Sequence, residues 1–154
     1  MGLPIVNLSR LAREAAAIVV PLAEEAGRTL DVELPASLPV RGRPDDLRDM
    51  VRNLLDNALV HGQGTIRLAA CLGVDPGGGQ ETWITVSDEG PGVPVGLGEA
   101  VFERFRKGSP ATMGHGLGLA IVREVVRGHG GTVVFLPGPC CQARITLPAV
   151  ERAG

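Results

Sequence analysis

The chain has 154 residues, 44% of them apolar, and a formal net charge of −2, which suits one domain with its own core. The small negative charge excludes a general basic surface for nucleic acid or anionic membrane, and the scarcity of aromatic residues argues against base stacking. Three cysteines without a CxxC pair, and no apolar run near the ~18 residues of a membrane span, are typical of the cytosol. We therefore expect one cytoplasmic domain over residues 1–154, with no nucleic-acid partner and no direct membrane contact.

The first element predicted is a helix. Apolar residues recur at helical spacing over residues 8–26, and Gly27 closes the run. Pro21 falls on the polar side of this helix, where we expect it to cause a kink. Residues 30–34 alternate and predict a short strand, and a Pro-rich link follows.

A second helix is predicted from Pro44 to His61. Proline suits the first helical position, and the acidic pair Asp45 and Asp46 suits the first turn. An apolar stripe over residues 47–59 then gives this helix one buried face.

The second half of the chain predicts strands around one more helix. The strands lie at 65–72, 82–86, 132–136 and 142–147. A Gly- and Pro-rich stretch over residues 90–116 is long for a simple connection and is typical of a functional lid. Residues 117–126 predict a well-buried helix, because apolar residues cover most of its circumference. We therefore predict an α+β fold, a two-layer sandwich in which about three helices pack on a mixed, mostly antiparallel sheet of about five strands.

Two asparagines stand four residues apart on the second predicted helix. In the sequence Arg52–Ala58, Asn53 and Asn57 share one face at the edge of the apolar stripe. Asparagine is a poor helix former, and its amide oxygen is a neutral ligand suited to Mg²⁺ that already carries phosphate. Taken alone, the two asparagines are explained equally well as half-exposed polar residues with no role in binding.

A second motif, Asp88–Gly92, directly follows a predicted strand. A carboxylate at a strand end accepts hydrogen bonds and donates none, so Asp88 would favour an exocyclic amino group over a carbonyl, and adenine over guanine. The glycines at 90 and 92 would let the backbone approach a base or act as a hinge. Taken alone, the motif fits an ordinary β-turn better.

The third motif, Gly114–Leu119, opens the last helix. Glycines ahead of a helix N-terminus expose backbone N–H groups beside the positive end of the dipole, which suits phosphate. The spacing fits neither a P-loop nor a dinucleotide fingerprint, so the motif alone is weak evidence.

The order of these motifs resembles the histidine kinase branch of the Bergerat-fold nucleotide binders, over residues 8–148. In that family the three motifs are the N, G1 and G2 boxes, and Phe102–Phe105 matches the F box between them. Four boxes in order are far more specific than one. The resemblance implies an ATP-binding catalytic domain of a sensor histidine kinase, without its dimerisation and phosphoacceptor domain.

The resemblance also assigns roles to residues. Asp88 would bind the adenine amino group, and Gly90 and Gly92 would flex at the base of the ATP lid. Asn57 would coordinate Mg²⁺, and Asn53 would assist at the phosphates. Gly116, Leu117 and Gly118, at the start of the last helix, would lie against the triphosphate. Lys107 resembles a basic lid position that reaches the γ-phosphate, although a solvated loop lysine explains it nearly as well.

The implied reaction is transfer of the ATP γ-phosphoryl group to a histidine on that separate domain, and then to a response regulator. Related ATPases carry a water-activating glutamate where this chain has Asn53, which cannot act as a base. The chain alone should therefore bind ATP without phosphorylating itself on histidine.

Two other functions remain open for this chain. One is an anti-sigma-factor-type serine kinase, a class that tends to carry that glutamate, and the other is a degenerate nucleotide-binding module. A parent anchored in the inner membrane is typical of the family.

Several positions depart from the family pattern. Val60 stands where a lysine or arginine often contacts phosphate, and Arg43 replaces a frequent aspartate before the second helix. Cys140–Cys141 falls where the family often has Gly-Thr near adenine. None of the histidines has the context of a phosphoacceptor. We expect structural or surface roles for His61 and His129; His115 fits a solvated loop residue better than a phosphate contact.

Overall fold

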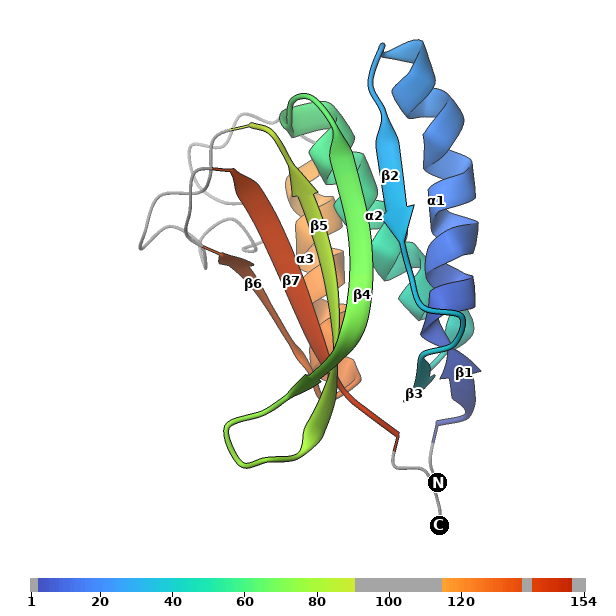
Figure 1. Cartoon of the computed structure of the whole chain (residues 1–154), viewed down its shortest axis with the longest axis vertical. Coiled ribbons are helices and arrows are strands. Elements are labelled where there is room, and N and C mark those ends of the chain that lie inside the picture. The colour runs from blue at the N-terminus through green and yellow to red at the C-terminus, as the bar shows by residue number, and fades with distance from the viewer. Residues whose placement is uncertain (1–2, 91–114, 137–139, 151–154) are drawn as a thin grey trace.

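The computed structural model describes residues 3–90, 115–136 and 140–150, which fold into two layers (Figure 1). Three helices lie against one face of a five-stranded sheet with strand order β2-β4-β5-β7-β6. The elements are β1 (Ile5–Asn7), α1 (Leu8–Glu25), β2 (Leu30–Glu33), β3 (Pro39–Arg41), α2 (Pro44–His61), β4 (Ile66–Val74), β5 (Gln80–Asp88), α3 (His115–Gly128), β6 (Thr132–Leu136) and β7 (Cys141–Pro148).

The sheet is mixed, as the sequence predicts. β2 pairs with β4 in parallel, and the other three pairings are antiparallel. Alternate residues of β4, β5 and β7 are buried against the helices, so each strand gives one face to the core. The α+β prediction and the three helices are confirmed for the part of the chain described.

A second, two-stranded sheet was not predicted. β1 pairs with β3 in antiparallel register, with Val6 opposite Val40. Each strand has three residues, too few to show alternation, and β3 begins at Pro39 within the Pro-rich link. The interpretation of that segment as a plain link was wrong.

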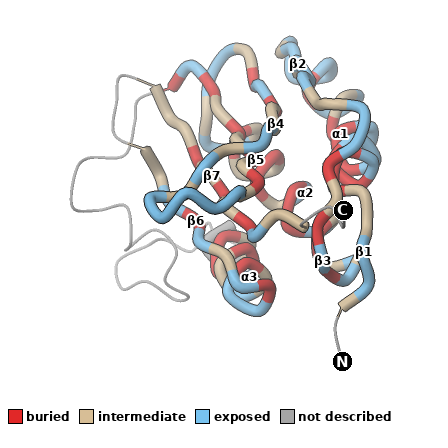
Figure 2. Tube along the Cα trace, turned by 60° about the horizontal axis from the view of Figure 1, so that its bottom comes forward, coloured by how far each residue is buried: buried red, intermediate tan, exposed pale blue. Residues whose placement is uncertain are grey.

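One core joins the two layers. Fully buried side chains come from α1, α2 and the inner face of the sheet, including Leu11, Leu55, Ile84 and Ile145 (Figure 2). The buried residues of α2 recur at helical spacing, which confirms the apolar stripe. No helix in the described ranges is both long and apolar enough to cross a bilayer.

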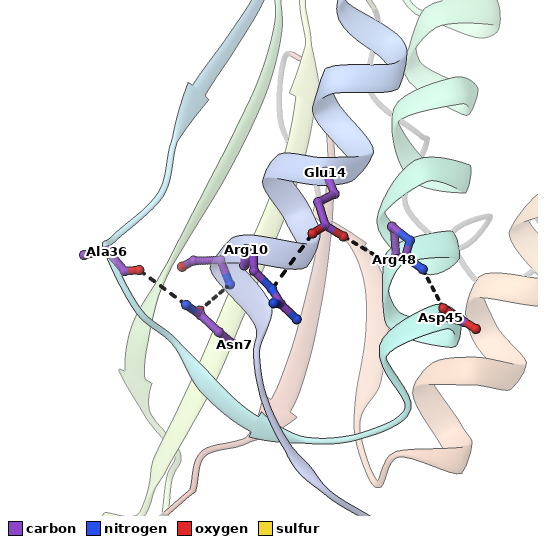
Figure 3. Close-up of polar contacts among 7 residues, drawn as sticks. Asn7, Arg10, Glu14, Ala36, Asp45 and Arg48 are labelled. Carbon is purple, nitrogen blue, oxygen red and sulfur yellow. Dashed lines mark hydrogen bonds and ion pairs between the residues drawn. The ribbon is translucent and has the colours of Figure 1, made fainter.

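Polar contacts fix the start of α1 and its packing on α2 (Figure 3). The Asn7 side chain accepts the N–H groups of Ser9 at 3.1 Å and Leu38 at 3.0 Å, so it caps α1 and fastens the segment ahead of β3. Arg48 of α2 bridges Glu14 of α1, at 2.7 Å, to Asp45. These contacts set the register between the two helices.

His129 holds the N-cap residue of α2 through a backbone hydrogen bond. Arg43 is the N-cap residue, makes no capping hydrogen bond and pairs with Asp46 instead. Its backbone N–H donates to Nε2 of His129 at 3.1 Å, while Nδ1 of that ring lies 2.7 Å from the Val125 carbonyl. The ring is therefore neutral with its proton on Nδ1, and it ties α3 to the start of α2. Its burial, with 8% exposed, confirms a structural role.

We expect His129→Ala to lower the free energy of unfolding by about 1–3 kcal/mol, because the Arg43 N–H and the Val125 carbonyl both lose a buried partner. Urea unfolding measures the change. Glu124→Ala on the exposed side of the same helix is the control and should have little effect. Equal stability of the two variants would contradict this role for His129.

Candidate functional site

Asp88 ends β5 on its inner face and is buried, with 6% of its surface exposed. Its Oδ1 accepts the N–H groups of Gly90 at 2.6 Å and Gln63 at 3.3 Å. Its Oδ2 faces Gly62, where a Cβ would come within 2.3 Å, and no hydrogen bond within the described residues reaches it. One carboxylate oxygen is thus held by two backbone N–H groups, and the other has no hydrogen-bond partner among the described residues.

The loop after α2 is fastened to the end of β5. The Glu89 N–H donates to the Gln63 carbonyl at 2.8 Å, and Glu89 Oε1 accepts the Thr65 N–H at 2.9 Å. Gly64 has a positive φ of 68°, and a Cβ there would collide with Glu89 Oε1. Residues 62–65 therefore lie against the strand end in one defined conformation.

Cys141 begins β7 opposite Asp88 in the antiparallel register. Its N–H donates to the Gly90 carbonyl at 3.1 Å, which fixes the backbone just after Asp88. Burial, then the negative charge of Asp88 and then Cys140, raises the pKa of the Cys141 thiol to about 11. A neutral thiol therefore lies beside the carboxylate at physiological pH.

The asparagine pair lies half-buried on α2, with its side chains unpaired within the described residues. A Cβ placed at Gly118 would lie 3.3 Å from Asn53 Oδ1, so α3 passes close to α2 at this point. The second and third sequence motifs therefore meet α2 at two different places, Asp88 at its end and Gly118 near Asn53. Asn57, one turn after Asn53, falls between them along the helix.

These parts share one end of the molecule. In Figure 1 the end of α2, the end of β5, the start of β7 and the start of α3 all lie at the top of the view. A buried acceptor, two amide groups and a helix N-terminus are thus arranged along α2. That set suits a ligand with an amino-bearing ring at one end and anionic groups at the other.

Other predicted site residues lie outside the described ranges. They are Gly92, Lys107 and the stretch Phe102–Phe105. Gly116 and Leu117 lie in the first turn of α3, which starts at His115. Among the described residues, no cluster of three or more histidine, cysteine, aspartate or glutamate side chains could hold a metal ion.

Two contacts of this site were missed by the sequence analysis. Arg28, between α1 and β2, donates to three carbonyls at the end of α2 and in the following loop. Glu89 fastens that loop from the other side. An arginine after a helix-closing glycine carries no sequence signal for such a role. Val60, where a basic residue was expected, is 51% exposed on α2.

The family model for histidine kinase-, DNA gyrase B- and HSP90-like ATPases matches residues 42–151. The chain belongs to this family. Its architecture is accordingly the Bergerat fold, as the order of the sequence motifs predicts. The match spans every site residue described above except Arg28.

Individual relatives place the chain beside the histidine kinases of this ATPase family. It is 36% identical to the sensor histidine kinase TmoS of Ectopseudomonas mendocina in an alignment 157 positions long, which covers 96% of this chain and 16% of TmoS. The ATP-binding domain of PrrB from Mycobacterium tuberculosis superposes with a TM-score of 0.70 at 32% identity, covering 96% of this chain and 97% of that one. Full-length ShkA in complex with AMPPNP superposes with a TM-score of 0.79 at 26% identity, and the match covers all of this chain and 33% of ShkA. The chain thus corresponds to a minor part of the length of the full-length kinases.

We expect Cys141 to react slowly with iodoacetamide at pH 8, because a pKa of about 11 lowers its thiolate fraction about 100-fold relative to a thiol of pKa 9.0. Exposed Cys71 is the internal reference, and mass spectrometry of each peptide gives both rates. Asp88→Asn should speed labelling of Cys141, since it removes a negative charge that raises the pKa. Labelling of Cys141 as fast as Cys71 in the unaltered chain would contradict this.

Proposed function

We propose that this chain is the ATP–Mg²⁺-binding catalytic domain of a two-component sensor histidine kinase. It would give the γ-phosphoryl group of ATP to a histidine on a separate dimerisation domain of the same parent, leaving ADP, and that phosphate would pass to a response regulator. The observation that carries the proposal is the Asp88 side chain, whose Oδ1 accepts two backbone N–H groups and whose Oδ2 has no hydrogen-bond partner among the described residues.

The free oxygen of Asp88 would select adenine. It accepts a hydrogen bond from the exocyclic amino group of adenine, whereas the carbonyl of guanine would face it with a second acceptor. Because the carboxylate is buried, that mismatch would leave polar groups unpaired away from water. Gly90 and the predicted hinge Gly92 would form the base of the lid next to this contact.

The phosphates would lie along α2 toward α3. Asn57 would hold Mg²⁺ through its amide oxygen, and Asn53 and Gly118, which lie close together, would face the triphosphate. When bound, Mg²⁺ would neutralise part of the negative charge of the phosphates. The start of α3 with Gly116 and Leu117, and Lys107 of the lid, would complete this end.

The side chains present favour transfer over hydrolysis. Asn53 cannot activate a water, and its amide is suited to hold a phosphate or its cation. His129 is buried and engaged through both ring nitrogens, so it is no phosphoacceptor. The acceptor histidine would belong to another domain, and catalysis would consist mainly of positioning and charge neutralisation. The domain would be cytoplasmic, with the parent anchored in the inner membrane.

A degenerate nucleotide-binding module is the second candidate. Val60, exposed where a basic residue is expected, and Cys141, a thiol where a hydroxyl is expected, favour it. The two candidates differ in transfer: with an added dimerisation domain that carries the acceptor histidine, the kinase yields phosphohistidine and the module binds ATP only.

We expect Asp88→Asn and Asn57→Ala each to weaken binding of Mg²⁺–AMPPNP at least tenfold, because the first loses a charged acceptor and the second a metal ligand. Isothermal titration calorimetry measures both, with and without Mg²⁺. Asp75→Asn is the matched control, since Asp75 also accepts two backbone N–H groups, from Gly77 and Gly79, in the distant β4–β5 turn. Failure of the unaltered chain to bind AMPPNP would overturn the proposed function.

A further inference from the structure

Arg28 is half-buried and holds the end of α2 and the loop that follows it. Its Nη1 donates to the Leu59 carbonyl at 2.6 Å, Nη2 to the Ala58 carbonyl at 3.2 Å, and Nε to the Gly64 carbonyl at 2.9 Å. The first two belong to the last turn of α2, where the Ala58 carbonyl also accepts the Gly62 N–H at 2.9 Å. A planar guanidinium spans three acceptors at once and suits the negative end of the helix dipole.

The loop that Arg28 fixes is the one that carries the Gln63 N–H to Asp88. On one side, Arg28 holds the Gly64 carbonyl; on the other, Glu89 holds Gln63 and Thr65. The 3.3 Å bond from the Gln63 N–H is one of two that orient Oδ1 of Asp88. The orientation of the free oxygen therefore depends on where this loop lies.

We propose that Arg28 is a positioning residue for base recognition, acting through the loop at 62–65 on the Asp88 carboxylate. The inference rests on the proposed function, in which Asp88 reads the adenine amino group. Without Arg28 the loop loses the contact on its Gly64 carbonyl and keeps only those to Glu89 and Asp88 on the other side. The Gln63 N–H then moves, and the carboxylate rotates more freely about its last bond. The contact with the base weakens, whereas Asn53 and Gly118, held by the packing of α2 and α3, keep their places at the phosphate end.

A positioning role and a purely structural role for Arg28 predict different changes in nucleotide affinity. Loss of general stability would reduce the affinity for every nucleotide in the same proportion. Loss of base positioning reduces the preference for adenine over guanine and leaves the effect of Mg²⁺ unchanged.

The chain offers a matched control in Arg13. Its Nη2 also donates to two backbone carbonyls, Leu34 at 3.0 Å and Pro35 at 3.1 Å, in the segment after β2. Arg13→Ala therefore removes the same kind of arginine–carbonyl contact, but from a segment that makes no contact with Asp88 in the described part of the chain. Arg28→Lys keeps the charge but cannot span three carbonyls.

The test measures dissociation constants of AMPPNP and, in competition, GMPPNP, for the unaltered chain, Arg28→Ala, Arg28→Lys and Arg13→Ala. We expect Arg28→Ala to lower the AMPPNP/GMPPNP preference about tenfold, Arg28→Lys to lower it less, and Arg13→Ala to leave it unchanged, with the Mg²⁺ dependence of AMPPNP binding equal in all four. An unchanged preference in both Arg28 variants, or equal losses for both nucleotides, would overturn the role of Arg28 while leaving the proposed function intact. Lack of AMPPNP binding by the unaltered chain would instead overturn the proposed function, and this inference with it.

Discussion

The carboxylate of Asp88 joins the end of β5 to the loop that follows α2, and the geometry of the site depends on this junction. Its Oδ1 takes N–H groups from both sides, Gln63 on the loop and Gly90 after the strand. A buried carboxylate is costly unless it is hydrogen-bonded, so these contacts are what allow Asp88 to lie at the edge of the core. The strand end, the loop and the carboxylate therefore form one unit.

From that junction α2 leads to the other end of the proposed site. Asn57 and Asn53 follow at successive turns of the helix, and a Cβ at Gly118 would lie 3.3 Å from Asn53 Oδ1, so α3 passes close to Asn53. In the proposed function, the length of α2 between the carboxylate and the asparagines would separate the base from the phosphates. His129 supports this arrangement from behind, since it ties the end of α3 to the start of the same helix.

The sequence predicted most of this fold because its signals are local. The stripe of α2, the alternation of β5 and the proline at the start of α2 each act over a few residues, and the elements they predict are present. The pair β1–β3 was missed because three-residue strands show no pattern. Long-range contacts were missed for a related reason: the carbonyls that Arg28 holds are backbone atoms about 30 residues away, and no side-chain identity reveals them. The structure places Asp88, Asn53 and Gly118 around α2 as the motif order implied; their roles toward ATP are still predictions.

The most direct test of the account is a crystal structure of this chain with Mg²⁺ and AMPPNP. We expect the adenine amino nitrogen within about 3.2 Å of Oδ2 of Asp88, with the Gln63 N–H still on Oδ1 and the metal on the amide oxygen of Asn57. Adenine bound away from Asp88, or rotated so that its amino group points to solvent, would contradict the claim that the junction of α2 and β5 recognises the base.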